Sequence, residues 1–80
     1  FSEIFDLELE KLFKNADISR YSDSLYNFLL KKLEHSLIRK TLSVVNGNQI
    51  KASRILGLNR NTLRKKINEL DIEIIKKVKS

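Results

Sequence analysis

The sequence of 80 residues contains no cysteine, proline, methionine or tryptophan, and only two glycines. Without cysteine it has no disulfide, no thiolate metal site and no cysteine nucleophile, which is in keeping with a reducing cytoplasm. Without proline, and with glycine only at Gly47 and Gly57, it favours helices joined by short turns over a sheet. No apolar run approaches the roughly 20 residues that span a bilayer, and no signal-peptide core is present, so we expect a soluble protein without a membrane partner.

Acidic residues are missing from a long stretch, because none occurs between Glu34 and Glu69. Residues 1–46 hold seven basic and seven acidic side chains, whereas residues 47–80 hold nine and three, so the formal charge of +6 belongs to the second half. The basic residues of the acid-free span are Arg39, Lys40, Lys51, Arg54, Arg60, Arg64, Lys65 and Lys66. Such a span attracts a polyanion and makes its binding depend on salt, although a merely solvated basic face is the alternative.

The sequence shows no arrangement typical of catalysis or metal binding. His35 is the only histidine, and a hydrolytic or metal site would need converging partners for it. Ser22, Ser24, Thr41 and Ser43 have no base at a recognisable spacing, and no glycine-rich loop for phosphate is present. We therefore expect no enzyme, no metal and no cofactor.

Residues 1–45 are predicted to form two helices and a dimerisation region. The first helix is expected from about Glu3 to Asn15, and after a polar connection to Tyr21 a second begins at Ser22 or Asp23 and continues to about Val45. Such a second helix is about 35 Å long, and its apolar surface is more than one short neighbour can cover, which favours a homodimeric four-helix bundle over a monomeric core. The residues expected at the interface are Phe5, Leu9, Leu12, Leu25, Phe28, Leu29, Leu33 and Leu37.

Residues 46–70 have the pattern of a helix-turn-helix. Gly47 is expected in the left-handed position that ends the long helix, and Asn48 is expected to cap a short helix from Gln49 to Leu56. Gly57 allows the turn, and Asn59 then caps the second helix of the motif.

In that second helix Leu63, Ile67 and Leu70 recur with helical spacing on one side. The opposite side presents Asn61, Arg64, Lys65 and Asn68, and Arg60 stands at the leading end. A helix of this kind can offer donors to base edges and phosphates. The complete prediction is an all-α fold of four helices, followed by a basic tail at residues 71–80.

The segment GNQIKASRILGLNRNTLRKKINEL resembles the C-terminal DNA-binding domain shared by the factor for inversion stimulation (Fis) and the activators of the nitrogen-regulation protein C (NtrC) class. The preceding SLYNFLLKKLEHSLIRKTLSVV is similar to the long dimerisation helix of that family, so the resemblance covers about residues 23–70. Three positions depart from the family pattern. Ser53 replaces a second alanine, Ile50 replaces a hydroxyl residue, and Asp71 replaces a glycine.

The resemblance implies a homodimer that places one recognition helix from each subunit in adjacent major grooves of double-stranded DNA. It implies base contacts, with a guanine edge for Arg60, and bases or backbone for Asn59, Arg64 and Lys65. Asn61, on the exposed side of the same helix, is expected to contact bases as well. It implies contacts to the DNA backbone from Asn48, Gln49, Lys51, Thr62 and Lys66. The operator sequence and the regulated genes do not follow from it.

The family context implies the DNA-binding domain of a cytoplasmic, nucleoid-associated activator, with an ATPase domain on the N-terminal side and alternative-sigma RNA polymerase as partner. A start at Phe1 and the lack of methionine are typical of a segment of a longer protein. A free-standing nucleoid protein of the Fis type would have the same residues. A basic helical adaptor or membrane-surface module is a more distant alternative, favoured only by the tail, in which Ile74, Ile75 and Val78 are interspersed with lysines.

Overall fold

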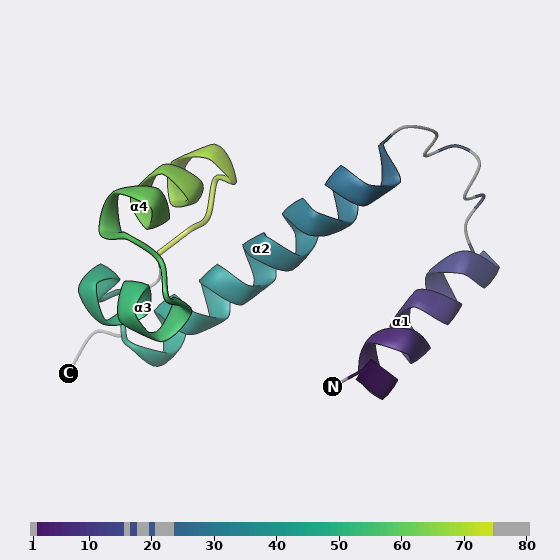
Figure 1. Ribbon diagram of the computed structural model, residues 1–80, viewed down its shortest axis with the longest axis horizontal. Helices are drawn as coiled ribbons and strands as arrows, with labels where there is room; N and C mark the ends of the chain where they lie inside the picture. Colours follow the sequence, from purple (N-terminus) through teal and green to yellow (C-terminus); the bar gives the residue numbers. More distant parts are fainter. Residues whose placement is uncertain (1, 16, 18–19, 21–23, 75–80) are drawn as a thin grey trace.

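The computed structural model describes residues 2–15, 17, 20 and 24–74. These residues form four helices and no strand: α1 (Ser2–Asn15), α2 (Leu25–Val44), α3 (Gln49–Leu56) and α4 (Arg60–Glu69). Figure 1 shows α3 and α4 gathered at the C-terminal end of α2, while α1 lies toward the other end. The predicted all-α class and the order of the four helices are therefore confirmed.

The hydrophobic core belongs to the helix-turn-helix end of the molecule. It consists of Ile38 and Leu42 from α2, Ala52 from α3, Leu63 and Ile67 from α4, and Ile72 beyond α4. Each of these side chains is at least 94% removed from solvent. The small side chain of Ala52 is fully buried, which allows α3 to lie close to its neighbours. The core thus holds α4 in a fixed place on α2 and α3.

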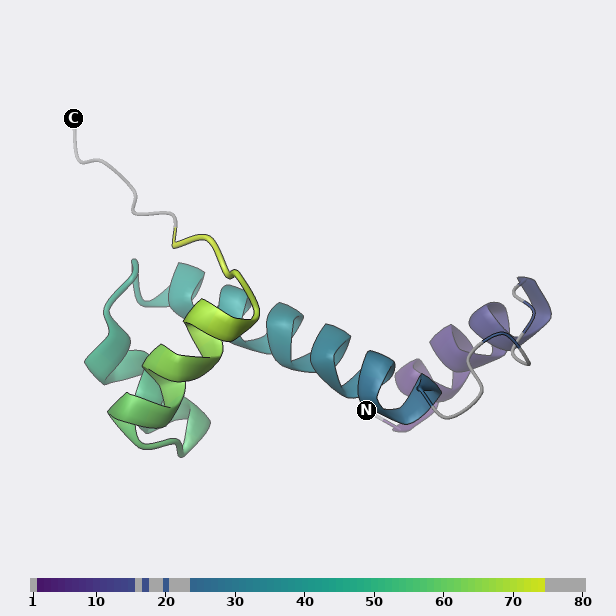
Figure 2. The same cartoon turned by 90° about the horizontal axis from the view of Figure 1, so that it is seen from above.

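The other end of the molecule is a helical arm without a core of its own. α1 has no buried residue, and the buried residues of α2 all lie in its C-terminal half. In both views α1 runs in the direction opposite to α2 (Figure 2). The radius of gyration is 15.2 Å, whereas a compact domain of this length has about 11.6 Å. The arm therefore leaves much of its apolar surface in solvent.

Three of the helices end in the same hydrogen-bonding pattern, the Schellman motif. At the end of α3 the Leu58 amide donates to the Ser53 carbonyl, and Gly57 has φ of 69°. A methyl group at Gly57 would meet no atom within 4 Å, so the backbone conformation, and not the space, calls for glycine there.

At the end of α2 the first left-handed residue is Asn46, with φ of 54°, and Gly47 follows with φ of 81°. Gly47 was expected at the left-handed position that ends the helix, but Asn46 occupies that position and Gly47 follows it, because asparagine also tolerates the left-handed region.

The chain beyond α4 returns to the core. Asp71 has φ of 51°, and the Ile72 amide donates to the Ile67 carbonyl at 3.0 Å. This turn directs Ile72 inward, where it is 6% exposed, and Ile74 is half-buried beside it. Asp71 therefore adopts a left-handed conformation at the position where the family pattern has glycine, and residues 71–74 are part of the packed end. The rest of the predicted basic tail lies outside the described residues.

The helix boundaries agree with the expected ones to within about two residues where they are described. α2 ends at Val44, and its N-cap is Ser24. The two caps suggested by the sequence, Ser22 and Asp23, lie outside the described residues, as does Phe1.

The two asparagine caps give a first testable prediction. The Asn48 Oδ1 atom accepts from the Lys51 amide at 3.1 Å, which satisfies one free donor of α3. We expect Asn48→Ala to lower the free energy of unfolding by about 0.5–2 kcal/mol, measured by chemical denaturation. Asn27→Ala, at an exposed position within α2, has no cap to lose and should stay within about 0.5 kcal/mol. Equal losses in the two variants would contradict a capping role.

Candidate nucleic-acid interface

Helix α4 is amphipathic, with one apolar side that packs in the core and one polar side that faces solvent. Leu63 and Ile67 are buried in the core, and Leu70 is half-buried just after the helix. The helix begins directly after Asn59, whose Oδ1 atom accepts from the Asn61 amide at 2.8 Å. The cap fixes the residue at which α4 begins, and the buried apolar side fixes which residues of the helix face solvent.

The solvent side of α4 consists of polar and charged residues. The exposed side chains are Arg60, Asn61, Thr62, Arg64, Lys65, Asn68 and, at the C-terminal end, Glu69. All but Asn68 and Glu69 are residues that the sequence predicts to contact DNA. The structure therefore brings the predicted base-contacting residues of this helix onto its surface, where guanidinium, ammonium and amide donors are accessible.

Helix α3 adds a second group of polar residues beside the first. Lys51 and Arg54 are exposed one turn apart, Asn48 is exposed at the cap, and Gln49 is half-buried. The side-chain oxygens of the two caps, Asn48 and Asn59, are already bonded to backbone amides. Their amide nitrogens are the groups that remain for contacts with phosphates or bases.

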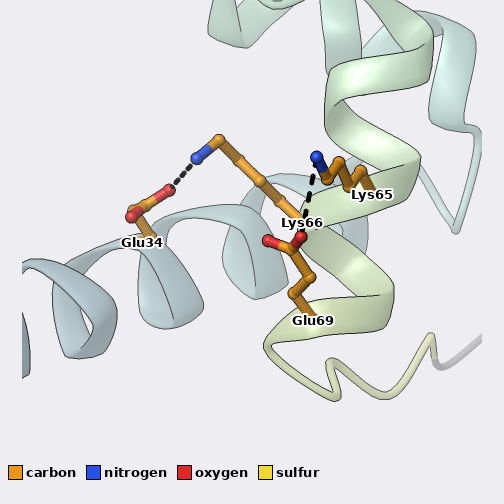
Figure 3. Close-up of polar contacts among 4 residues, drawn as sticks. All are labelled: Glu34, Lys65, Lys66 and Glu69. Carbon is orange, nitrogen blue, oxygen red and sulfur yellow. Dashed lines mark hydrogen bonds and ion pairs between the residues drawn. The ribbon is translucent and has the colours of Figure 1, made fainter.

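Two lysines near the end of α4 have carboxylate neighbours, shown in Figure 3. The Lys66 ammonium lies 2.5 Å from the Glu34 carboxylate of α2, and both side chains are about one-third exposed (33% and 35%). The Lys65 ammonium lies 3.9 Å from Glu69 on the same helix, and these side chains are 76% and 60% exposed. Of the two predicted DNA contacts, Lys65 is thus far more open to solvent than Lys66.

The sequence reasoning missed two residues of this region. Glu34 is 32 residues away from Lys66, and no local pattern signals a pair at that distance. Ile72 was assigned to the tail, although its distance of five residues from Ile67 and the preceding Asp71 fit a left-handed turn with an apolar contact. The Lys65–Glu69 pair has the i, i+4 spacing that sequence alone can indicate.

Within residues 2–15, 17, 20 and 24–74, no cluster of three or more histidine, cysteine, aspartate or glutamate side chains has the arrangement of a metal site. Over the same residues, no helix combines the length and the apolar character needed to cross a membrane.

The sequence matches the profile of a protein family described as bacterial regulatory protein, Fis family, over residues 29–70. This range contains most of α2, both helices of the helix-turn-helix and the turn between them. It includes every residue of the polar surface described above.

Individual relatives are similar over a comparable range. The DNA-binding transcriptional regulator NtrC of Azospirillum brasilense is 53% identical over 58 residues, which is 72% of this chain and 12% of the relative. NtrC of Rhizobium meliloti is 50% identical over 56 residues, 70% of this chain and 12% of the relative. The DNA-binding protein Fis of Buchnera aphidicola is 41% identical over 59 residues, 74% of this chain and 60% of the relative.

The chain therefore spans about an eighth of the NtrC relatives and somewhat more than half of this Fis relative. No solved structure matches the chain significantly.

Proposed function

Because the chain belongs to the Fis family of bacterial regulatory proteins, we propose that it binds a specific double-stranded DNA site as a homodimer. We further propose that it is the DNA-binding domain of an NtrC-class transcriptional activator. In such a protein an ATPase domain on the N-terminal side would act on alternative-sigma RNA polymerase. The chain itself then performs no catalysis and works at the nucleoid in the cytoplasm.

The observation that supports DNA binding most strongly is the surface of α4. Its apolar side is fixed in the core by Leu63 and Ile67, while its exposed side carries Arg60, Arg64 and Lys65. A rigidly held helix with cationic and amide donors on its free side has the chemistry needed to read base edges in a major groove. The absence of acidic residues between Glu34 and Glu69 keeps the surrounding field positive.

The arm supports the homodimer. α1 and α2 enclose a mostly apolar groove of about 680 Å³, lined by Phe5, Glu8, Leu9, Leu12, Tyr26, Leu29, Leu30, Lys32, Leu33 and Ser36. Several residues of the predicted interface are strongly exposed, including Phe5, Leu33 and Leu37 at about half of their maximum. A second copy, with the same apolar surface, would cover them symmetrically.

The accessible surface area of the chain agrees with a second copy of the same chain as its partner. The accessible area of the chain is 6938 Å², whereas a compact monomer of this mass has about 5,000 Å². If each chain buried half of the difference, the interface would total about 1,900 Å², within the range of stable protein interfaces. The size of the exposed surface thus favours a dimer over a monomer.

Within the complex we assign guanine recognition to Arg60, which lies at the first position of α4. Base or backbone contacts are assigned to Asn59, Asn61, Arg64 and Lys65, and phosphate contacts to Asn48, Gln49, Lys51 and Thr62. Some of the phosphate contacts would use backbone amides at the starts of α3 and α4. The family resemblance also assigns Lys66 to a phosphate, but its ammonium group already contacts Glu34.

Arg60→Ala tests base reading. Arginine can donate two hydrogen bonds to guanine, worth about 1–3 kcal/mol of discrimination. We expect the variant to lose about that much binding free energy per half-site on the cognate DNA, and to lose its preference at one base pair in each half. Its affinity for random duplex DNA should barely change. Competition binding with cognate and guanine-substituted sites measures all three quantities.

The control is Lys51→Ala, an exposed lysine on α3 assigned to a phosphate. It should weaken cognate and random DNA about equally, because phosphates carry no sequence information. If Arg60→Ala also weakens every sequence alike, Arg60 contacts the backbone, and base reading belongs to Asn59, Asn61 or Arg64.

A free-standing nucleoid protein is the second candidate, because the chain spans 60% of the Buchnera Fis protein. The mass of the native polypeptide separates the two, since an NtrC-class activator is several times longer than this chain, as the 12% coverage of its relatives shows. An antibody against the chain should therefore detect a band several times heavier than 9.4 kDa in the source cells. A band close to the length of Fis would favour the nucleoid protein.

A further inference from the structure

The two acidic residues that border the acid-free span of the sequence meet at the same end of α4. Glu34 and Glu69 line one concavity of about 320 Å³ between α2 and α4, together with Lys31, Lys66 and Leu70. Glu34 contacts Lys66, and Glu69 lies near Lys65 (Figure 3). Each of two consecutive lysines in the recognition helix therefore has its own carboxylate neighbour.

The two pairs differ in geometry and in their exposure to water. Lys65 and Glu69 are separated by 3.9 Å and are both more than half exposed, so the Lys65 ammonium remains available to another anion. Lys66 and Glu34 are separated by 2.5 Å and are about two-thirds buried, and they join two different helices. A charge-assisted hydrogen bond of this kind holds the Lys66 ammonium against α2.

The position of Lys66 on α4 explains how it can reach either anion. It follows the exposed Thr62 by one turn, but it also lies three residues after the buried Leu63 and directly before the buried Ile67. Lys66 thus stands at the border between the side of α4 that packs on the protein and the side assigned to DNA. A long lysine side chain at such a border can turn to a protein carboxylate or to a phosphate, and a carboxylate that holds it neutralises the charge that it would offer to the phosphate.

We propose that Glu34 is an internal counter-ion that keeps Lys66 from the DNA phosphates, and so lowers the affinity of the domain for all DNA sequences alike. The proposal rests on the DNA-binding function proposed above. A lysine neutralised by a carboxylate displaces no counter-ion from DNA, so it adds nothing to the salt-dependent part of the affinity. Lys66 then joins α4 to α2, and the phosphate role that the family resemblance gives it is suppressed.

Glu34→Gln tests the proposal, because it removes the charge and keeps the shape of the side chain. We expect the affinity for cognate and random duplexes to rise by up to about fivefold per subunit, the factor of one exposed ion pair. The slope of log affinity against log salt should steepen by about 0.9 per subunit, the value of one added phosphate contact. In a Lys66→Met background the same change should have no effect, because the released cation is gone.

Three comparisons decide the outcome, with thermal melts to verify that each variant is folded. Glu10→Gln, at an exposed carboxylate of α1 that does not line the groove between α1 and α2, makes the same change in net charge away from α4 and should leave DNA binding unchanged. Lys66→Met alone should leave the salt slope unchanged, whereas Lys51→Met should reduce it.

The proposal is overturned if Glu34→Gln leaves affinity and slope unchanged, if Glu10→Gln raises the affinity as much, or if Lys66→Met flattens the slope as Lys51→Met does. These results all require that the unmodified chain binds duplex DNA. Failure of the unmodified chain to bind any duplex would instead overturn the proposed function, and this inference with it.

Discussion

The affinity of the dimer for its DNA site is expected to fall by about 10³ to 10⁵ between 50 and 200 mM salt. The reason is that the exposed basic and polar residues of α3 and α4, with the amides at their N-termini, are placed to neutralise on the order of eight phosphates per dimer. Each neutralised phosphate releases condensed counter-ions, and salt opposes that release. Fluorescence anisotropy with a labelled cognate duplex, titrated at several salt concentrations, measures the slope.

Anionic liposomes provide the comparison for this experiment. A basic membrane-surface module would bind them as tightly as duplex DNA and would protect no defined sequence in a footprint. We expect weak liposome binding, because the basic residues assigned to DNA lie on the two short helices of a compact motif and not along one long amphipathic helix. A flat salt response, or equal affinity for liposomes and DNA, would contradict a DNA interface.

Leu33→Asp is expected to convert the dimer into a folded monomer. In a single chain Leu33 is 50% exposed and is absent from the hydrophobic core, so a carboxylate there has little effect on the folding of the helix-turn-helix. In the dimer the side chain is predicted to be covered, and an unpaired buried carboxylate costs several kcal/mol. With one such charge in each chain, the dissociation constant of the dimer should rise on the order of 10⁴-fold or more. Sedimentation at micromolar concentration measures the mass.

Ile55→Asp is the matched control, because Ile55 is 63% exposed but lies on α3, away from the arm. This variant should sediment with twice the chain mass, as the unmodified protein should. A monodisperse folded monomer for the unmodified chain would exclude the proposed homodimer. If the Leu33→Asp variant remained dimeric, the dimer interface would have to lie outside the groove between α1 and α2.

Local sequence signals predicted most of the helix-turn-helix. Asn48 and Asn59 are side-chain caps, and Gly57 is left-handed, as the residue types indicated. The spacing of Leu63 and Ile67 correctly placed the buried side of α4 and, with it, the exposed side. These features depend on residues no more than about one turn apart, where backbone geometry alone decides which side chains share a face. The roles of individual residues on DNA remain predictions.

The sequence did not predict the contacts between segments that are distant along the chain. The spacing of apolar residues in α2 did not show that Ile38 and Leu42 belong to the core of the helix-turn-helix, whereas Leu33 and Leu37 remain exposed. All four lie on one helix with similar chemistry. The difference arises from where α3 and α4 pack along α2, which is a tertiary property (Figure 1).

The sequence by itself determined the four helices, the two asparagine caps and the turn of the helix-turn-helix, the family, and the positive charge of the second half of the chain. Those properties are local or compositional, so they can be predicted without knowledge of the packing. Only the tertiary structure decided that Ile72 completes the core and that Glu34 meets Lys66. Both contacts depend on the return of the chain toward α2, by a left-handed turn at Asp71 and by the crossing of α4 over α2. Whether a given lysine offers its charge to solvent or to a neighbouring carboxylate is fixed by that packing, because the partner lies 32 residues away.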